Sequence, residues 1–572
     1  MLDSVTKGRI DKLRNILVGK IPDPKSQVEQ ITTGLIYKFM YDMDEESVSD
    51  LGGVRSFFVG EYEKYSWINL FDTKLSGIEK VELYSEAIEK MYLNPTAPQL
   101  FREIFKNSFL PFRDPSTLNM FLKELNEFHY SNSENLGDAF EYLLSFMGSQ
   151  GDAGQFRTPR HIIDFIVEIV NPKKDERILD PSCGTAGFLI SSYKHILKSN
   201  TKEKQGDLLS AEERKKVGHN LVGYDISPDM TRISLVNMYL HKFANPEIHE
   251  YDTLSSEDRW NEYFDVILAN PPFFSPTGGI TPHDRFGVKS TRAEVLFVDY
   301  IMEHLKPKGR AGIIVPEGII FQTGTAYKNL RKNLVESSLV GVISLPAGVF
   351  QPYSGVKTSI LILDKEHNQK SDSIFFAKVE NDGFSLGAQR KPIGKNDLPK
   401  LNQQISLFLN DGMESDSILF VPSEEVIADK DVILSEGKYR SIKSSFESAF
   451  EIVQLDDVCK TITDGTHKTP KYTSEGIPFL RVTDITKSNS SKKFISKEEH
   501  LELIKRCKPE KGDILFSKNG TIGVAELVDW DYEFSIFVSL CLLKPYKEKI
   551  LSRYLKELMN SQNVLTPLYL FD

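Results

Sequence analysis

The sequence has few cysteines, no long apolar run and no export signal. Its four cysteines, Cys183, Cys459, Cys507 and Cys541, show no C-x-x-C spacing, which argues against a zinc site and fits a reducing cytoplasm. No apolar run approaches the roughly 18 residues that span a bilayer, and the N-terminus lacks a basic-then-apolar pattern. We therefore expect a cytoplasmic protein with no membrane partner and no bound metal.

The sequence also lacks an excess of positive charge. Its formal net charge of -11 argues against a generic nucleic-acid binder, which usually carries a basic stripe. From Lys438 onward, however, Lys and Arg (21) slightly outnumber Asp and Glu (19), so the acidic excess lies before this point. This distribution weakly favours the C-terminal part as a nucleic-acid surface. No P-loop ending in Lys-Ser/Thr and no nuclease cluster of carboxylates and lysine is present.

The patterning changes along the 572 residues, a length that allows several domains. Residues 1–145 carry helical spacing, and residues 146–365 alternate short apolar runs with amphipathic segments. That alternation predicts an α/β fold with a parallel, doubly wound sheet. Residues 366–451 are polar and loop-rich, which indicates a connecting region, and residues 452–572 begin a separate mixed α/β domain. The predicted strands of the sheet are 177–179, 221–224, 266–268, 311–315, 339–345 and 359–363.

The most informative motif is Asn270-Pro271-Pro272-Phe273, which directly follows the apolar run 264–269. Two prolines fix φ and remove two backbone donors, so the carbonyl groups of Asn270 and Pro271 can face a cavity as fixed acceptors. Such acceptors suit an amino group, and the ring of Phe273 can lie against a planar base. By itself, the motif is equally compatible with an ordinary strand-ending turn.

Two predicted helix N-termini offer unpaired N–H groups to a ligand. Asp180 ends a strand and leads into a loop in which Gly184 and Gly187 permit close backbone approach to a nucleotide. Upstream of the sheet, Thr158 is a good N-cap and Pro159 a good first helical residue, so the N–H groups behind them can receive a carboxylate. Each feature alone is weak, because glycine loops and helix starts are often only structural.

Two further acids follow other predicted strands. Asp225 ends the second strand, where an acid hydrogen-bonds ribose hydroxyls in doubly wound folds, and Asp252 follows a short third strand. Ligands bind at the carboxyl ends of the strands in open α/β sheets. We therefore expect Asp180, Asp225, Asp252 and Asn270 to surround one ligand site.

Residues 1 to about 450 resemble the modification subunit of a Type I restriction-modification system, an adenine-N6 DNA methyltransferase. The family carries G-Q-F-x-T-P, D-P-x-x-G-T-A-G-F, an acidic position and N-P-P-F, and this chain has them in that order from Gly154, Asp180, Asp225 and Asn270. That order is typical of the gamma class of amino methyltransferases. The resemblance implies a Rossmann-like S-adenosylmethionine-dependent methyltransferase sheet with a helical N-terminal domain.

The resemblance also implies where S-adenosylmethionine binds. Its methionine end would lie against residues 155–160, its ribose against Asp225 and its adenine near Asp252. Arg157 departs from the family, which commonly has an aromatic residue at that position. The implied cofactor residues are Gln155, Phe156, Arg157, Thr158, Pro159, Arg160, Asp180, Gly184, Thr185, Ala186, Gly187, Asp225 and Asp252, and the implied catalytic residues are Asn270, Pro271, Pro272 and Phe273.

The implied reaction is methyl transfer to a planar amine. The adenine amine is a poor nucleophile, and acceptors at Asn270 and Pro271 would expose its lone pair without a metal or a strong base. A duplex base must flip out to reach such a site, and Phe273 would stack on it. Cytosine N4 and the side-chain amide of glutamine in a protein present the same planar NH₂ group, so both stay open as substrates.

From Leu455 the chain resembles the start of a target-recognition domain of a Type I specificity subunit, in 463–470, 476–482 and 512–523. The resemblance covers about 118 residues, and neither a second recognition domain nor the long helical spacers of that family are visible. We expect a partial specificity-type recognition domain at 452–572. Candidate DNA contacts are Lys468, Lys471, Arg481 and Lys518 for phosphates and Thr466 and His467 for bases, although each can also be an ordinary surface residue.

The resemblance implies duplex DNA, a specificity subunit, a second modification subunit and a restriction subunit as partners, because translocation and cleavage would need another chain. Three hypotheses stay open: an adenine-N6 DNA methyltransferase, a catalytically silent assembly or DNA-binding subunit, and a protein-glutamine methyltransferase. The intact Asp180, Asp225 and Asn270 disfavour the silent subunit, and the flanking Type I-like segments disfavour the glutamine enzyme.

Overall fold

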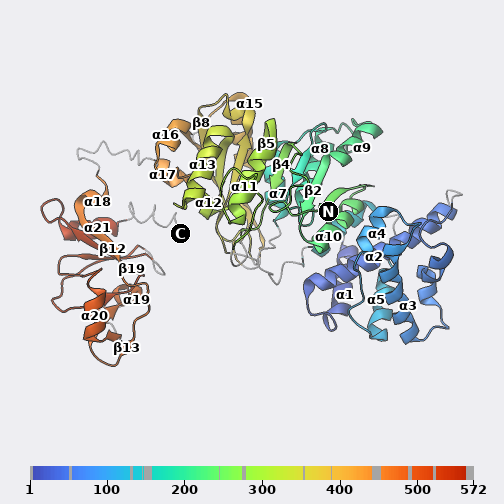
Figure 1. Cartoon of the computed structure of the whole chain (residues 1–572), viewed down its shortest axis with the longest axis horizontal. Coiled ribbons are helices and arrows are strands. Elements are labelled where there is room, and N and C mark those ends of the chain that lie inside the picture. Colours follow the sequence, from blue (N-terminus) through green and yellow to red (C-terminus); the bar gives the residue numbers. More distant parts are fainter. Residues whose placement is uncertain are drawn as a thin grey trace. The chain divides into compact units, whose positions relative to one another are not determined.

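The protein is described from a computed structural model in two units, residues 1–440 and 441–572, each taken by itself (Figure 1). The described residues are 4–49, 54–128, 133–144, 146, 158–243, 245–273, 279–351, 355–387, 390–415, 417–440, 453–486, 493–518 and 523–561. Within these ranges no helix is both long and apolar enough to cross a membrane.

The first part of unit 1 is helical, as its spacing predicts (Figure 1). On the second helix, the predicted stripe of Val28, Ile31, Leu35 and Phe39 is buried, so these residues form core. The elements are α1 (Ser4–Val18), α2 (Pro24–Ser49), α3 (Gly77–Lys90), α4 (Gln99–Phe105), α5 (Pro115–Leu125) and α6 (Ser133–Leu144), with the short 3-10 helices η1 (Gly60–Tyr65), η2 (Trp67–Phe71) and η3 (Met91–Leu93).

The rest of unit 1 is built on one large sheet. Among the described residues it has nine strands in the order β11-β8-β6-β7-β5-β4-β1-β2-β3. The strands are β1 (Ile178–Asp180), β2 (Leu221–Asp225), β3 (Glu247–Glu250), β4 (Phe264–Ala269), β5 (Leu305–Pro316), β6 (Leu339–Ser344), β7 (Thr358–Asp364), β8 (Ser373–Lys378) and β11 (Leu419–Pro422). From β1 the sheet extends through β2 to β3, and the chain then returns to form β4, which pairs with β1 on the side opposite β2. Strand order therefore reverses between β1 and β4, which opens a ligand crevice at their carboxyl ends.

Helices cover both faces of the sheet, which explains why strands such as β4 are continuous apolar runs. Val266 and Leu268 belong to the core on one face, and Ile267 and Ala269 to the core on the other. The first core includes residues of α7 (Arg160–Val170), α8 (Gly187–Ser199), α10 (Pro228–Leu240) and α15 (Leu398–Asp411), and the second includes residues of α11 (Ala293–His304), α12 (Glu317–Phe321), α13 (Thr325–Ser337) and α16 (Ser423–Ala428). The remaining helices of unit 1 are α9 (Ala211–Asn220), α14 (Lys365–Asn368) and α17 (Glu436–Tyr439).

One predicted strand runs in the direction opposite to expectation. The strand β7 is antiparallel to both neighbours, pairing Leu361 with Ile313 of β5 and Ile360 with Ile343 of β6. The chain leaves β6 and enters β7 at the same end of the two strands through the segment 345–357, whose described residues form no crossover helix. Such a return makes an antiparallel pair, so the sheet is mainly and not wholly parallel.

The segment predicted to connect the domains differs from that expectation over residues 366–440. It adds β8 and β11 to the sheet, α15 to one face, and a hairpin of β9 (Asp382–Phe384) and β10 (Pro392–Asn396). The fully buried Arg331 on α13 holds its end, donating to the carbonyl oxygens of Val432 (2.7 Å) and Asp431 (2.6 Å). Two of its strands escape prediction because β10 buries no residue and β11 buries only Val421, whereas β8 buries the apolar run 374–377.

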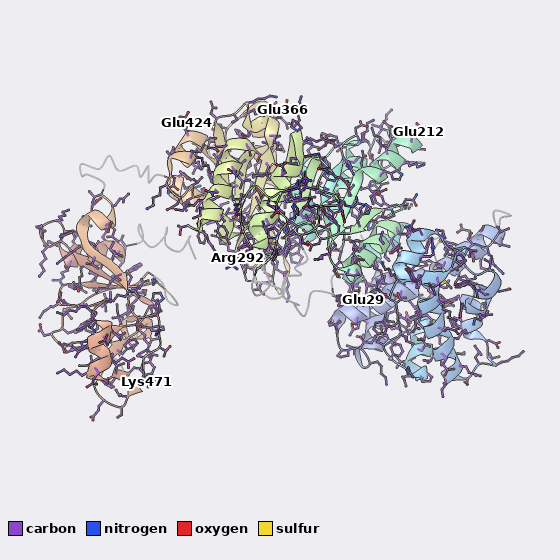
Figure 2. All side chains as sticks on the ribbon, in the orientation of Figure 1. Glu29, Glu212, Arg292, Glu366, Glu424 and Lys471 are labelled. Atoms are coloured by element: carbon purple, nitrogen blue, oxygen red, sulfur yellow. The ribbon has the colours of Figure 1, made fainter. Side chains whose placement is uncertain are left out.

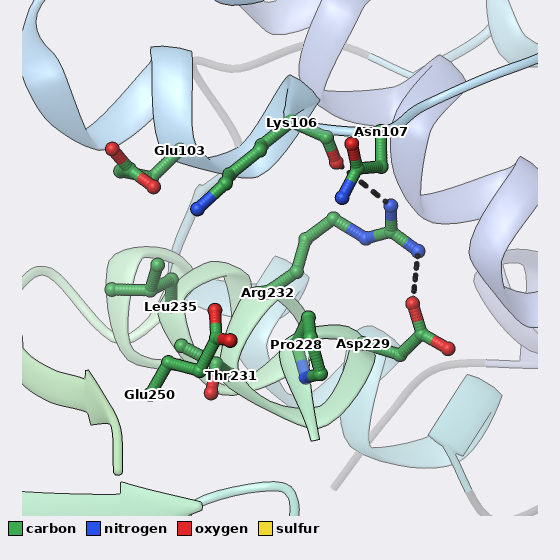
Figure 3. A pocket seen from close by; sticks show the side chains of 9 residues that line it. All are labelled: Glu103, Lys106, Asn107, Pro228, Asp229, Thr231, Arg232, Leu235 and Glu250. Atoms are coloured by element: carbon green, nitrogen blue, oxygen red, sulfur yellow. Dashed lines mark hydrogen bonds and ion pairs between the residues drawn. The ribbon is translucent and has the colours of Figure 1, made fainter. Parts of the chain in front are cut away.

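The helical region is attached to α10 through charged contacts (Figure 3). The Arg232 guanidinium donates to the backbone oxygen of Lys106 (3.3 Å) and lies 3.5 Å from Glu29 of α2. At the start of α10, Asp229 pairs with Lys25 (3.0 Å). These contacts stabilise the position of the helix that directly follows Asp225.

Unit 2 is of mixed α/β type, as predicted. Its described strands form two four-stranded sheets in the orders β12-β19-β16-β17 and β13-β15-β14-β18. They are β12 (Cys459–Asp464), β13 (Tyr472–Thr473), β14 (Ile477–Leu480), β15 (Phe494–Ile495), β16 (Ile514–Ser517), β17 (Ala525–Leu527), β18 (Ser535–Ile536) and β19 (Leu540–Pro545), with helices α18 (Leu455–Val458), α19 (Val482–Thr486), α20 (Lys497–Leu503) and α21 (Ser552–Met559).

Because α7 packs closely on the sheet, a side chain at Gly312 of β5 is predicted to destabilise the fold. A Cβ atom there would lie 2.4 Å from Cγ2 of Ile166 and 3.1 Å from Cγ2 of Val170. We expect Gly312→Ala to lower the free energy of unfolding by about 1–3 kcal/mol, measured by urea denaturation. Gly8→Ala on α1, where nothing lies within 4 Å, is the control and should be neutral or stabilising. Wild-type stability of Gly312→Ala would contradict this packing.

Candidate active site

One hydrogen bond joins two of the predicted motifs. Asn270 directly follows β4, and its Nδ2 donates to Oγ1 of Thr158 over 2.8 Å. Thr158 is 8% exposed and precedes α7. Because the amide nitrogen faces Thr158, the amide oxygen is the acceptor end of the side chain and is directed away from that hydroxyl. The predicted residues Gln155, Phe156 and Arg157 lie outside the described residues.

The start of α7 is tied to its neighbours. Pro159 is the N-cap and Arg160 the first helical residue, one position later than predicted. The Arg160 guanidinium donates to the backbone oxygen of Gly187 (3.0 Å) and forms an ion pair with Glu141 of α6. The structure therefore shows Arg160 linking the starts of α7 and α8.

The loop after β1 has an open inner surface. Gly184 (φ +52°) and Ala186 (φ +62°) both adopt the left-handed conformation, which turns the chain sharply into α8. A Cβ atom added at Gly184 would meet nothing within 4 Å, whereas one at Gly187 would lie 3.0 Å from Cδ1 of Ile163. The loop thus leaves space beside Gly184 and packs tightly against α7 at Gly187.

Two residues that hold this loop escape prediction from motifs. On α10, Ser234 Oγ donates to the backbone oxygen of Gly184 (2.5 Å), and Asn237 Nδ2 donates to that of Thr185 (2.7 Å). Both side chains are fully buried. Their signal in the sequence is two polar residues three positions apart in the otherwise largely apolar stretch 233–240, a spacing that places them on one face of the helix.

The acids at the ends of β1 and β2 lie in a buried environment. The pKa of Asp180 is raised to about 8, chiefly by burial and also by the nearby Asp225 carboxylate, against the hydrogen bond from the Ser182 N–H (3.2 Å). Burial also raises the pKa of Asp225. The Asp225 carboxylate accepts from the N–H of Gly184 (2.9 Å) and of Ser227 (2.8 Å), which fixes it between the two loops.

The turn after β3 lies beside Asp225, since β2 and β3 are neighbours. Asp252 accepts from the N–H of Leu254 (3.0 Å), and Thr253 Oγ1 donates to the backbone oxygen of Pro181 (2.8 Å), tying the turn to the β1 loop. Ile226, which motif reasoning missed, is 66% exposed directly after Asp225 and supplies an apolar surface there. Among the described residues no group of three or more His, Cys, Asp or Glu side chains is placed to hold a metal.

Phe273 lies in an aromatic contact. It is 7% exposed, and its ring meets that of Phe350 edge to face at 6.2 Å. Phe350 ends the segment 345–350, which directly follows β6. Stacking of Phe273 on a flipped base stays a prediction, as do the roles of Pro271 and Pro272.

In unit 2 the candidate DNA contacts fall into two groups. Lys468 and Lys471 are exposed, and Figure 2 shows Lys471 on the surface of the unit. The Thr466 hydroxyl hydrogen-bonds within its own turn, to the backbone of Lys468 (3.2 Å). The other three lie beside acids: Lys518 is 2.6 Å and His467 3.8 Å from Asp464, and Arg481 is 3.4 Å from Asp484.

Fold and site together describe an α/β protein whose candidate ligand site lies where strand order reverses, beside the loop after β4. The family described as "N-6 DNA Methylase" matches residues 131–447, more than half of the chain, so the chain belongs to that family. The family described as "Type I restriction modification DNA specificity domain" matches residues 447–568. The resemblance seen in the motifs is thereby confirmed.

Relatives and solved structures agree with this assignment. The EcoEI methylase subunit of Escherichia coli is 30% identical over 332 residues, 56% of this chain and 66% of the relative. The EcoKI methylase subunit of Escherichia coli (strain K12) is 28% identical over 318 residues, 53% and 58%. The chain thus spans less than two thirds of either relative's length.

The predicted methyltransferase-type fold is confirmed by two solved structures. A chain from a structure of the type I R-M system has TM-score 0.63 and 24% identity, covering 78% of this chain and 93% of that chain. The type I methyltransferase subunit from Streptococcus thermophilus has TM-score 0.58 and 19% identity, covering 76% and 99%.

The raised pKa of Asp180 predicts a pH-dependent stability. Between about pH 4 and pH 8 the folded protein keeps a proton that the unfolded chain has lost, so this contribution is full below about pH 4 and lost toward pH 8. We expect Asp180→Asn to gain stability relative to wild type as pH rises from 5 to 8, in urea denaturation. The exposed Asp258→Asn is the control, and a pH-independent difference for Asp180→Asn would contradict the assignment.

Proposed function

We propose that this chain transfers a methyl group from S-adenosylmethionine to N6 of adenine in duplex DNA, as the modification component of a Type I restriction-modification complex in the cytoplasm. The hydrogen bond between Asn270 and Thr158 carries the proposal. It puts a loop suited to accept an amine next to the segment expected at the methionine end of the cofactor. Family membership and the specificity-type match at 447–568 support adenine in DNA as the substrate.

The residues present fit S-adenosylmethionine. The space beside Gly184 admits a ligand against the loop backbone, Asp225 is fixed at the end of β2 to accept from ribose hydroxyls, and Ile226 offers an apolar surface to an adenine ring. Asp252 would lie at the adenine side, one strand farther out. When bound, the cofactor supplies an electrophilic methyl group on a positively charged sulfur.

Asn270 and Pro271 would activate the target amine. The amide oxygen of Asn270 and the backbone oxygen of Pro271 accept the two N6–H hydrogens, which localises the nitrogen lone pair toward the methyl group. With both hydrogens engaged, N6 would attack the methyl group that the cofactor supplies, with the sulfur as leaving group, and would then lose one proton to solvent. Thr158 keeps the acceptor end of the amide turned toward the amine by engaging Nδ2. No strong base is required.

The target adenine would be flipped out of the duplex, at a cost of a few kcal/mol. Phe273, the last residue of the catalytic loop, has its ring edge to face with that of Phe350 and would stack on the extruded base. Lys468 and Lys471 of unit 2 are exposed and would contact phosphates, while Lys518 and Arg481 would first exchange Asp464 and Asp484 for phosphate.

The proposed partners are duplex DNA, a specificity subunit, a second modification subunit and a restriction subunit. A silent assembly subunit is the second candidate function, and the favouring observation is the pairing of unit 2 cations with acids, which weakens DNA capture by this chain alone. A protein-glutamine substrate would need the same acceptors at Asn270, and the specificity-type match disfavours it.

Methylation in cells tests the proposal. The chain is expressed alone and with its neighbouring specificity and restriction subunits in a methylation-free host, and N6-methyladenine is mapped. We expect modified adenines at one sequence motif, and none with Asn270→Ala although the purified variant still binds S-adenosylmethionine. Asn333→Ala, on the exposed surface of α13, is the matched control and should behave as wild type.

Four outcomes separate the alternatives. Methylation by Asn270→Ala would refute the mechanism. The absence of modified adenines in every wild-type setting would favour the silent subunit, and methylated glutamine in host protein would favour the third hypothesis. Modification only with partners would place target selection outside this chain.

The Thr158 hydroxyl should govern the rate of transfer. In Thr158→Val the acceptor for Asn270 Nδ2 is lost at nearly constant volume, which removes this restraint on the orientation of the amide. Loss of a hydrogen bond to a positioned group is worth about 1–3 kcal/mol, so we expect kcat to fall roughly 10- to 100-fold in single-turnover assays. Thr158→Ser, which keeps the hydroxyl, should retain most of the rate, and equal rates for the two variants would exclude this role.

A further inference from the structure

The β9–β10 hairpin contacts both sides of the candidate site. No catalytic or binding role for this hairpin follows from the predicted motifs, and it projects from the segment that the sequence presents as a connector. It meets the start of α7 through Asp382 and Phe384, and it meets the segment 345–350 through Leu386. The first contact lies next to Thr158, which accepts from Asn270, and the second involves the segment whose Phe350 packs against Phe273.

The first contact is built on a buried carboxylate. The Asp382 side chain has no exposed surface, and Oδ2 lies 2.9 Å from Nε2 of His161 and in an ion pair with Arg390. Phe384 stacks on the His161 ring with centroids 4.5 Å apart and planes 28° apart. His161 is the second residue of α7, three positions after Thr158, so the hairpin holds the first turn of that helix from outside.

The charges in this cluster depend on one another. Burial alone would raise the pKa of Asp382, but the His161 hydrogen bond and the Arg390 guanidinium together bring it below its ordinary value. Arg390 is itself only 13% exposed and also donates to the backbone oxygen of Ser385 (3.1 Å). Removal of the carboxylate charge would leave a largely buried guanidinium unpaired, which is strongly unfavourable.

The second contact is between backbones. Gly348 has φ +91°, and a Cβ atom there would lie 2.8 Å from the backbone oxygen of Leu386. The hairpin therefore lies directly over the segment 345–350. Two residues farther along, Phe350 packs edge to face with Phe273 of the catalytic loop. The same hairpin thus limits movement on the cofactor side and on the base side of the loop.

We propose that the β9–β10 hairpin is a positioning element of the methyltransferase site and that Asp382 is its positioning residue. Asp382 fixes His161, and with it the first turn of α7, so that Thr158 stays in register to orient the Asn270 amide. This inference rests on the proposed function for its rate effects. Its structural effect, order in the first turn of α7, is independent of that function.

The test uses the full chain, with its partner subunits where modification requires them. Asp382→Asn keeps an acceptor for His161 but loses the charge that pairs with Arg390. We expect faster hydrogen–deuterium exchange over residues 158–170 with unchanged exchange over α13. In single-turnover methylation the rate should fall about tenfold, while the Kd for S-adenosylmethionine changes less than about threefold.

A compensating variant separates positioning from general destabilisation. Asp382→Asn combined with Arg390→Gln replaces the ion pair by a neutral amide pair and should recover most of the rate. Asp44→Asn, which neutralises another buried carboxylate in α2 that accepts backbone N–H groups, is the matched control and should lower stability without lowering the rate.

Failure of this inference and failure of the proposed function give different results. Unchanged exchange over residues 158–170 in Asp382→Asn would overturn the positioning role whether or not the wild type methylates DNA. A rate loss in Asp382→Asn that Arg390→Gln does not reverse, or an equal loss in Asp44→Asn, would also overturn it. If the wild type had no activity but Asp382→Asn still showed faster exchange over residues 158–170, only the proposed function would be refuted.

Discussion

The reversal of strand order between β1 and β4 is the constraint on which the rest of unit 1 depends. It separates the chain that follows β1 from the chain that follows β4, and the two loops then face one crevice instead of packing on each other. Asn270 emerges from β4 at this crevice, and α7, which begins beside it, is held by its packing on β5. The hydrogen bond from Asn270 to Thr158 links the loop after β4 to the start of α7. It also orients the Asn270 amide, whose NH₂ group donates and whose oxygen accepts hydrogen bonds.

The loops at the crevice are held mainly by buried polar side chains. Ser234 and Asn237 of α10 bind the carbonyl oxygens of Gly184 and Thr185, and the Asp225 carboxylate binds the N–H of Gly184. A loop fixed in this way loses little conformational entropy when a ligand binds, which favours affinity through preorganisation. Because α10 is in turn held by the helical region, that region supports the site although it supplies no residue of the crevice described above.

The sequence predicts the sheet and the strand-end residues well, because both depend on local patterns. Continuous apolar runs indicate buried strands; Asp225 ends one of these strands, and Asn270 directly follows another. The direction of β7 is not predictable in this way, since strand direction depends on the path of the connection and not on the strand's own residues. The contact of His161 with Asp382 escapes prediction for a similar reason, because 221 residues separate the partners and neither belongs to a recognisable motif.

The two units differ in how firmly their polar side chains are held by partners within the protein. In unit 1 the groups around Asn270 have fixed protein partners, which suits a reaction with one geometry. In unit 2, Lys518 and Arg481 pair with acids at partly exposed positions, where ion pairs are worth little and exchange readily. On the proposed function, a phosphate would replace Asp464 or Asp484, and exchanging one anionic partner for another yields less free energy than neutralising an unpaired cation. With a net charge of -11 the chain as a whole also repels DNA, so stable binding would draw on the cations of its partner subunits.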